Sequence, residues 1–205
     1  HTAQRPRDMT LMYREVEGEP RGFIVVESLI SKPDSAYAKS HDFVPTRLND
    51  GRLGTVERPA REVDALGLPG LSVDPGDAEQ TGEGWRRTLH LESGVEQRFV
   101  QISVPVEAGL QKAWVNGELA LDTSLATKQQ RKFTTLRVVN PGAGPLSLEL
   151  LTSNPDAFKA AIVTWHDLPG VLTAPFLGNW PDNARAANYG PRAENVQEIR
   201  VPAAN

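Results

Sequence analysis

Two adjacent imidazole and carboxylate pairs, His41-Asp42 and His166-Asp167, are the side chains of this sequence that come closest to acid-base chemistry. A histidine beside a carboxylate exchanges protons near neutral pH, so each pair could form half of a catalytic site. The alternative is structural, because neighbours on an extended chain point to opposite sides and both pairs are expected to lie at turns. We favour the structural interpretation, and the sequence predicts no catalytic residue in this chain.

Nucleophilic and metal-dependent chemistry have no better candidates. Residues 70–74, Gly-Leu-Ser-Val-Asp, lack the final glycine of the turn that exposes a nucleophilic serine. The chain has no cysteine, so a metal would need His and carboxylate ligands, and no two of the four histidines are one helical turn apart. The acidic residues between 74 and 83 lack the spacing of a calcium loop. We therefore expect no metal or cofactor site in this chain.

Aromatic residues near the C-terminus indicate a candidate binding surface and not a catalytic site. Residues 171–192 are rich in Pro and Asn but also contain large apolar side chains, so we expect an ordered loop. Trp180 is the best candidate for an exposed contact, because no predicted strand requires its burial. The candidate interaction surface consists of Trp180, Tyr189, Phe176, His166 and Asp167. An alternative is a sugar-binding platform lined by aromatic side chains, with Trp180 as its best candidate; the residues are Trp85, Trp114, Trp165 and Trp180, with Tyr13, Tyr37 and Tyr189.

The elements that position these residues are expected to be strands. Between residues 86 and 151, apolar and polar residues largely alternate, and a two-residue period is typical of half-buried strands. The expected strands are residues 86–92, 98–104, 113–115, 119–121, 134–138 and 146–150. Short strands joined by turns bury their apolar faces by stacking two sheets. We therefore predict a mainly β chain, an antiparallel β-sandwich with short helical turns and long irregular loops.

The flanking segments complete this prediction. Residues 10–16 and 22–28 read as a hairpin, with the second strand apolar enough to be buried on both faces, and residues 33–40 predict one or two helical turns. Asn116-Gly117 predicts a type I′ hairpin turn. Residues 44–84 show Pro, Gly and charge without periodicity, so we expect an irregular connection there. Residues 1–205 are predicted to form a single domain, and 44–84 is where an internal boundary would fall.

Composition narrows the classes of partner. The 205 residues carry a net charge of -4, which argues against a phosphate-binding surface, so we expect no nucleic-acid partner. No run approaches the ~20 apolar residues that span a bilayer, so the segment itself is expected to be soluble. The 17 Gly and 16 Pro favour many turns and few long helices.

One series of segments resembles a known family. In chain order, the series consists of Arg5-Pro6, Leu11-Met12-Tyr13, residues 31–37, 87–91, 113–117, 146–150 and 167–170. Together these segments are similar to the C-terminal extracytoplasmic region of membrane-embedded proteins of peptidase family M28. In that family, a zinc aminopeptidase-like domain is followed by transmembrane helices and then by a β-rich domain. The resemblance spans most of the chain.

The resemblance implies a non-catalytic accessory or interaction domain of a membrane-bound, M28-like zinc metallopeptidase. Zinc would be held only by the peptidase domain, whose His, Asp and Glu ligands have no counterpart in this sequence. The implied location is the extracytoplasmic face of a bacterial membrane, in the periplasm or at the cell surface. The implied partner is the peptidase domain of the parent chain or another protein near the membrane.

Two other functions stay open from the sequence. The first is a carbohydrate-binding β-sandwich module of an extracytoplasmic protein, which would use the aromatic residues around Trp180. The second is a hydrolase whose site combines His166 and Asp167 with a distant serine.

Overall fold

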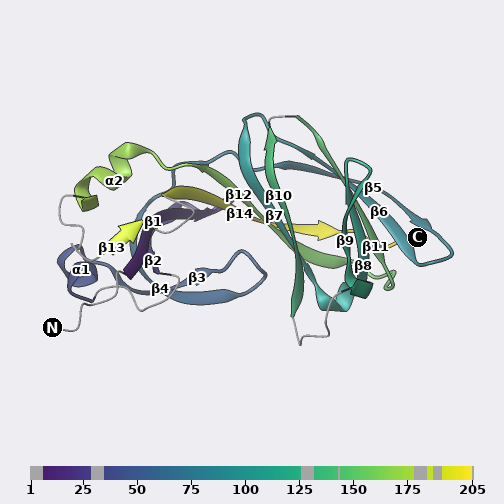
Figure 1. The fold of residues 1–205 in the computed structure, drawn as a ribbon, viewed down its shortest axis with the longest axis horizontal. Helices are drawn as coiled ribbons and strands as arrows, with labels where there is room; N and C mark the ends of the chain where they lie inside the picture. Colours follow the sequence, from purple (N-terminus) through teal and green to yellow (C-terminus); the bar gives the residue numbers. More distant parts are fainter. Residues whose placement is uncertain are drawn as a thin grey trace. The chain divides into compact units, whose positions relative to one another are not determined.

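Alternating side chains and tight turns give this chain a structure in which strands predominate. The computed structural model describes residues 7–28, 35–125, 132–142, 144–177, 184–186 and 191–204. Within these residues the predicted fold class is confirmed: the chain is mainly β, largely antiparallel, and forms two sheets with short helices (Figure 1). The chain divides into two compact units, and β12 (Phe158–Asp167) and β14 (Arg192–Val201) contribute residues to both.

Unit 1 comprises His1–Asn49, Thr55–Leu68 and Trp165–Asn195. Its elements are β1 (Arg7–Val16), β2 (Arg21–Ser28), α1 (Ser35–Ser40), β3 (Val44–Asn49), β4 (Thr55–Asp64), α2 (Gly170–Leu177) and β13 (Ala184–Ala186). The hydrogen-bonded strand order is β14-β1-β2-β4-β3, and β13 pairs with β1 in parallel. The predicted hairpin is confirmed, because β1 and β2 are antiparallel and Gly18 takes a φ of 79° in the turn between them.

Apolar side chains fill both faces of the β1–β2 hairpin. Leu11 and Ile24 belong to one apolar cluster, whereas Met12 and Val25 belong to a second. Because successive side chains of a strand point to opposite faces, each strand contributes to both clusters. The burial of residues 22–28 on both faces that the sequence predicts is thus confirmed.

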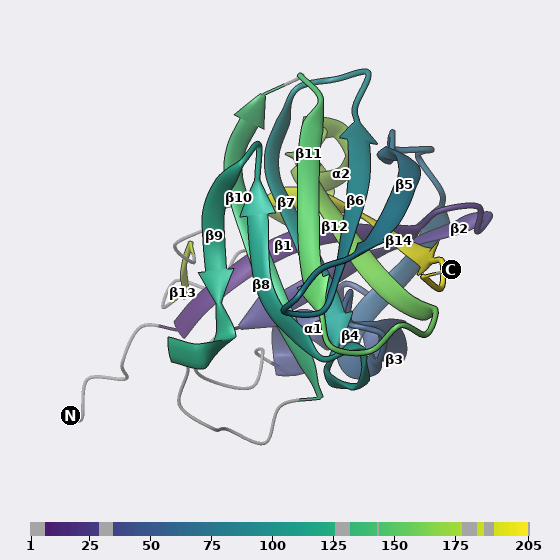
Figure 2. The ribbon, with the colours of Figure 1, turned by 90° about the vertical axis from the view of Figure 1, so that its right-hand side faces the viewer.

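Unit 2 comprises Asp50–Gly54, Pro69–Thr164 and Val196–Asn205. Its other elements are β5 (Ser72–Gln80), β6 (Trp85–Glu92), β7 (Gln97–Pro105), η1 (Val106–Ala108), β8 (Leu110–Val115), β9 (Glu118–Asp122), η2 (Thr123–Leu125), β10 (Phe133–Gly142) and β11 (Leu146–Thr152). One sheet has the order β5-β6-β11-β8-β9, seen face-on in Figure 2, and the strands of the other are β10-β7-β12-β14. Leu89 and Leu148 from the first sheet share one apolar core with Ile102 and Ile162 from the second, which makes unit 2 a β-sandwich.

Two local predictions in unit 2 are confirmed. Asn116 and Gly117 take φ values of 51° and 81°, as a type I′ turn requires, and they join β8 to β9. His90 is exposed between the buried Leu89 and Leu91, as the alternating pattern predicts.

The prediction of an irregular connection over residues 44–84 is wrong. Strands β3, β4 and β5 occupy most of this stretch, and β4 pairs with β2 on one side and β3 on the other. Many of their side chains are exposed and are Pro or charged, so the sequence does not show the alternation of apolar and polar residues that predicts a strand. Pro75 fits because β5 is an edge strand with a register shift between Pro75 and Ala78. The division between Leu68 of unit 1 and Pro69 of unit 2 falls within this stretch.

The helices of the structure are short. Helix α1 confirms the helical turns predicted within residues 33–40. Helix α2 corrects the prediction of a loop from residue 171, because burial of Phe176 in the unit 1 core stabilises a segment whose Gly and Pro content favours a loop. Across the described residues, no helix has both the length and the apolar character needed to cross a membrane.

Candidate functional site

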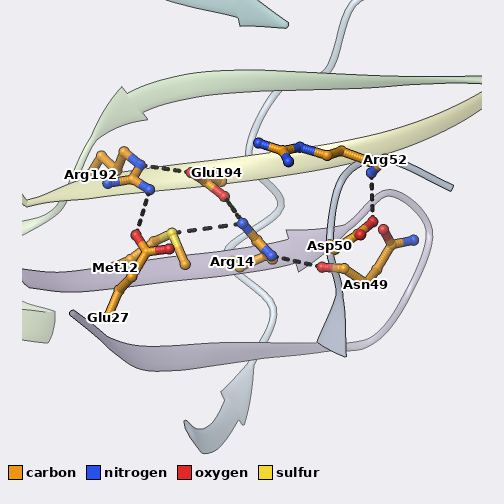
Figure 3. Close-up of polar contacts among 8 residues, drawn as sticks. All are labelled: Met12, Arg14, Glu27, Asn49, Asp50, Arg52, Arg192 and Glu194. Atoms are coloured by element: carbon orange, nitrogen blue, oxygen red, sulfur yellow. Dashed lines mark hydrogen bonds and ion pairs between the residues drawn. The ribbon is translucent and has the colours of Figure 1, made fainter. Parts of the chain in front are cut away.

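A cluster of buried charges lies on three neighbouring strands of unit 1 (Figure 3). Glu194 of β14 accepts hydrogen bonds from Arg14 Nε of β1 at 2.8 Å and from Arg192 Nε at 2.6 Å. Arg192 also donates from Nη2 to Glu27 Oε2 of β2 at 2.9 Å. The Arg192 guanidinium lies over the Trp165 ring, 4.5 Å from its centroid. These contacts link β14, β1 and β2 through their side chains.

Two charges of this cluster, on Glu194 and Arg192, have shifted pKa values. Burial alone would raise the pKa of Glu194, but the attraction of Arg14 and Arg192 and their hydrogen bonds hold it below its usual range. Burial alone would lower the pKa of Arg192, but Glu194 and Glu27 hold it above its usual range. The arrangement therefore acts as a brace across strands β14, β1 and β2, in which Glu194 and Arg192 favour each other's charged form.

A second buried carboxylate, Glu15 of β1, binds the backbone of the segment that directly follows β4. It accepts hydrogen bonds from the Tyr13 hydroxyl at 2.5 Å, from Leu66 N at 2.9 Å and from Leu68 N. Burial, together with the bond to Glu15, raises the pKa of Tyr13 above its usual range. The Tyr13-Glu15 pair therefore anchors the backbone that follows β4.

The residues predicted as an interaction surface lie in different settings. Phe176 of α2 is only 3% exposed, its ring centroid is 5.3 Å from that of Phe43, and its carbonyl accepts a hydrogen bond from the Tyr37 hydroxyl at 3.0 Å. His166 is half-buried and Asp167 is exposed at the end of β12. Trp180 and Tyr189 lie outside the described residues, so the surface predicted around them stays a prediction.

The His41-Asp42 pair lies directly after α1. The His41 ring is 4.7 Å from Tyr37 and 5.5 Å from Phe176 between centroids, and its Nε2 is buried with no hydrogen-bond partner among the described residues. Asp42 takes a φ of 58°, a turn conformation. The imidazole is thus a member of an aromatic cluster, and its neighbour turns the chain toward Phe43.

The serine and the acidic residues noted in the sequence lie on or beside β5. Ser72 and Asp74 are exposed strand residues, and Glu83 forms an ion pair with Lys112 at 2.8 Å. In the part of the chain that the structure describes, no three His, Cys, Asp or Glu side chains lie close enough to hold a metal ion together.

An open groove of about 660 Å3 lies in unit 2 between the free edges of its two sheets. β9 is the last strand of one sheet and β10 is the last strand of the other, and Figure 2 shows the two edges next to each other. The groove is lined by Arg52, Ala120, Leu121, Lys132, Phe133, Thr135, Leu136 and Arg137. We refer to it as the β9–β10 groove.

The β9–β10 groove is positively charged. Among the described residues its lining includes three cations, Arg52, Lys132 and Arg137, and no carboxylate, and none of the three forms an ion pair with another described residue. The Arg52 guanidinium lies 5.8 Å from the centroid of the Phe133 ring. The nearby Asp50 carboxylate instead accepts the backbone N–H groups of Arg52 and Gly54, at 2.7 and 3.0 Å. The cations are therefore available to an anionic ligand.

Acidic residues mark the ends of β9. Glu118 begins the strand, and Asp122 ends it. The Asp122 carboxylate accepts hydrogen bonds from the hydroxyl and the backbone N–H of Ser124, at 2.6 and 2.9 Å, and these bonds hold its pKa below its usual range. The cations of the β9–β10 groove therefore have acidic residues at both ends of the neighbouring strand β9, on a chain whose net charge is -4.

Sequence reasoning did not find this groove. Arg52 belongs to the stretch 44–84, for which the sequence predicts an irregular connection, and nothing in the sequence places it beside the expected strand 134–138. The available signal was the alternation of Phe133, Thr135 and Arg137 around the expected strand 134–138, which does not show that this strand lies at the edge of a sheet. That signal does not show that Arg52 lies against Phe133.

Comparisons with known proteins give little for this chain. No protein-family model matches it, and no curated protein matches it. Among solved structures it is similar to BslA, a bacterial hydrophobin, with 16% identity, coverage of 67% of this chain and 95% of that chain, and a TM-score of 0.34. It is also similar to the Fcho1 Mu homology domain of Danio rerio, solved with a bound Eps15 peptide, with 9% identity, 95% coverage of both chains and a TM-score of 0.28. Likeness at this level carries no argument about function.

Proposed function

We propose that this chain is an interaction domain that binds a partner through the edges of its β-sandwich and performs no catalysis of its own. The observation that supports this most strongly is the β9–β10 groove. It combines two free strand edges with Arg52, Lys132 and Arg137, which have no carboxylate partner among the described residues. A partner protein can form hydrogen bonds with free backbone groups of an edge strand and ion pairs with unpaired charges on a surface.

The buried carboxylates support the same proposal. Glu15 and Glu194 accept hydrogen bonds from donors within unit 1, so their charges hold strands and loops in place. A carboxylate held ionised between two guanidinium groups is poorly suited to exchange protons with a substrate near neutral pH.

We further propose that the partner is the peptidase domain of a membrane-bound, M28-like zinc metallopeptidase whose accessory domain is this chain. The order of sequence segments from Arg5-Pro6 to residues 167–170 supports this assignment. Zinc would then be bound by the peptidase domain, and both domains would face the outside of a bacterial membrane.

Binding between the purified chain and the peptidase domain of the same gene tests this proposal by isothermal titration calorimetry. We expect a saturable complex that Arg137→Glu weakens about tenfold, because a charge at the contact is reversed. Arg200→Glu is the matched control, since it makes the same charge change at an exposed residue of β14 and should leave binding unchanged.

An activity assay tests the other half of the proposal. The chain alone, given zinc and aminopeptidase substrates, is expected to produce no turnover above buffer. Robust turnover by the chain alone would contradict the proposal, and failure to bind the peptidase domain would remove the assigned partner.

A further inference from the structure

The β9–β10 groove follows the free edge of β10. Five of its eight lining residues belong to β10 or directly precede it, and two come from β9. Among the described residues β10 pairs with β7 alone, from Phe133 opposite Pro105 to Val139 opposite Phe99. In an antiparallel pair, alternate residues direct their N–H and C=O groups away from the partner strand, so β10 offers a row of backbone groups to the groove.

The side chains of the β10 edge differ between its two faces. Phe133, Thr135 and Arg137 alternate along the strand and share one face, next to Arg52. Leu136 points to the other face, where it joins the apolar core together with the half-buried Leu121 of β9. A strand placed beside β10 would therefore meet cations on one face and leucines on the other.

Exposed apolar side chains extend this surface along both edges. Leu119 of β9 is 56% exposed and Val139 of β10 is 67% exposed. Apolar residues on an edge strand are favourable contacts for an added strand.

We propose that the β9–β10 groove binds an extended acidic segment of a partner protein, which adds to the edge of β10 as a further strand. Its acidic side chains would contact Arg137 and Arg52 on one face, with Lys132 directly before the start of β10, and the alternate apolar side chains would contact Leu136 and Leu121. Backbone hydrogen bonds give such a complex its affinity, and the alternation of side chains gives its specificity. This inference rests on the proposed function as an interaction domain and specifies the chemistry of its ligand.

Charge favours this occupant over two others. A second copy of the chain paired edge to edge would bring Lys132 and Arg137 close to the same residues of its partner, and like charges across a strand pair are destabilising. A nucleic acid would bring many phosphates near Glu118 and Asp122 on a chain of net charge -4. A short peptide that alternates acidic and apolar residues avoids both problems.

Fluorescence anisotropy with labelled peptides of about ten residues tests the proposal. A peptide that alternates Glu and Val is expected to bind, and its counterpart with Lys in place of Glu is expected to bind at least about tenfold more weakly. Arg137→Glu should weaken binding of the acidic peptide to a similar extent, and Arg200→Glu should not. Equal binding of the two peptides would overturn the proposal.

Two N-methylated forms of the acidic peptide separate strand addition from simple charge attraction. One carries N-methyl groups on its Glu residues and the other on its Val residues. An added strand directs only alternate N–H groups toward β10, so one form should lose binding and the other should keep it. Equal binding of both forms, or equally tight binding of an RNA oligonucleotide or of anionic lipid vesicles, would overturn strand addition. Loss of peptide binding with an intact complex with the peptidase domain would reject this inference and leave the proposed function standing.

Discussion

The guanidinium of Arg52 lies over the ring of Phe133, 5.8 Å from its centroid, and joins the segment Asp50–Gly54 to the start of β10. Arg52 is exposed, and it lines the β9–β10 groove together with Lys132 and Arg137. The contact with Phe133 orients a cation toward the groove without neutralising it. The groove therefore has a charged wall that is already positioned for an anionic ligand.

Replacing Arg52 with Ala is expected to weaken binding of the acidic peptide about threefold to tenfold, because one of the three cations is lost. Its effect on stability should be small, about 0.5–1 kcal/mol, since the cation–π contact is exposed. Anisotropy titrations and urea denaturation measure the two effects. Unchanged peptide binding together with a clear loss of stability would show that Arg52 only braces the fold.

Replacing Glu194 with Gln is expected to destabilise the chain by about 3 kcal/mol, because Arg14 and Arg192 would lose their buried partner. Glu198→Gln on the same strand is the control. Glu198 is exposed and lies 3.8 Å from Lys159, so its replacement should change stability by less than about 0.5 kcal/mol. Equal urea midpoints for the two variants would contradict the role assigned to Glu194.

Stability should also fall in acid because of Glu194. Its pKa in the folded chain lies below the ordinary value of 4.5, so it contributes stability that is fully present above that value and is lost as the pH falls through the folded pKa. Urea midpoints between neutral pH and about pH 3 should decline less steeply in Glu194→Gln than in the unchanged chain. Parallel declines would contradict this prediction.

The loss of stability at alkaline pH should depend on the ionisation of Tyr37. Burial raises its pKa from 10.0 to about 12, so its neutral form contributes stability that is present below pH 10.0 and is lost as the pH rises toward 12. Tyr37→Phe should reduce this decline, although it also removes the hydrogen bond to the Phe176 carbonyl. An ultraviolet titration of the folded chain that shows every tyrosine ionising near pH 10.0 would contradict the prediction.

The sequence predicts the sandwich because its strand pattern is local. Alternation around Leu89 and Leu91 and the Asn116-Gly117 turn depend on backbone geometry that neighbouring residues determine. Strands β3 and β4 pair with each other as neighbours, but they escape prediction because their exposed faces carry Pro and charge and because β4 also pairs with β2, on the other side of α1 in the sequence.

Buried charges escape prediction for a similar reason. Arg87 occupies a core-facing position of β6, where its guanidinium donates to the Thr152 hydroxyl at 2.5 Å and to the backbone carbonyls of Asn154, Pro155 and Asp156. Strand periodicity shows which way Arg87 points, but only tertiary structure supplies the acceptors that make its burial tolerable. The β9–β10 groove likewise depends on Arg52, whose contact with Phe133 no local pattern indicates.

Amide hydrogen exchange of β10 in the presence of the acidic peptide tests the central claim most directly. If the peptide adds to the edge of β10, the outward N–H groups between Phe133 and Val139 should exchange more slowly when it is bound. β5 is the control, because it is also an edge strand and should exchange at the same rate with or without the peptide. Unchanged exchange in β10 at saturating peptide, or equal slowing in β5, would contradict the claim that this chain binds its partner through the β10 edge.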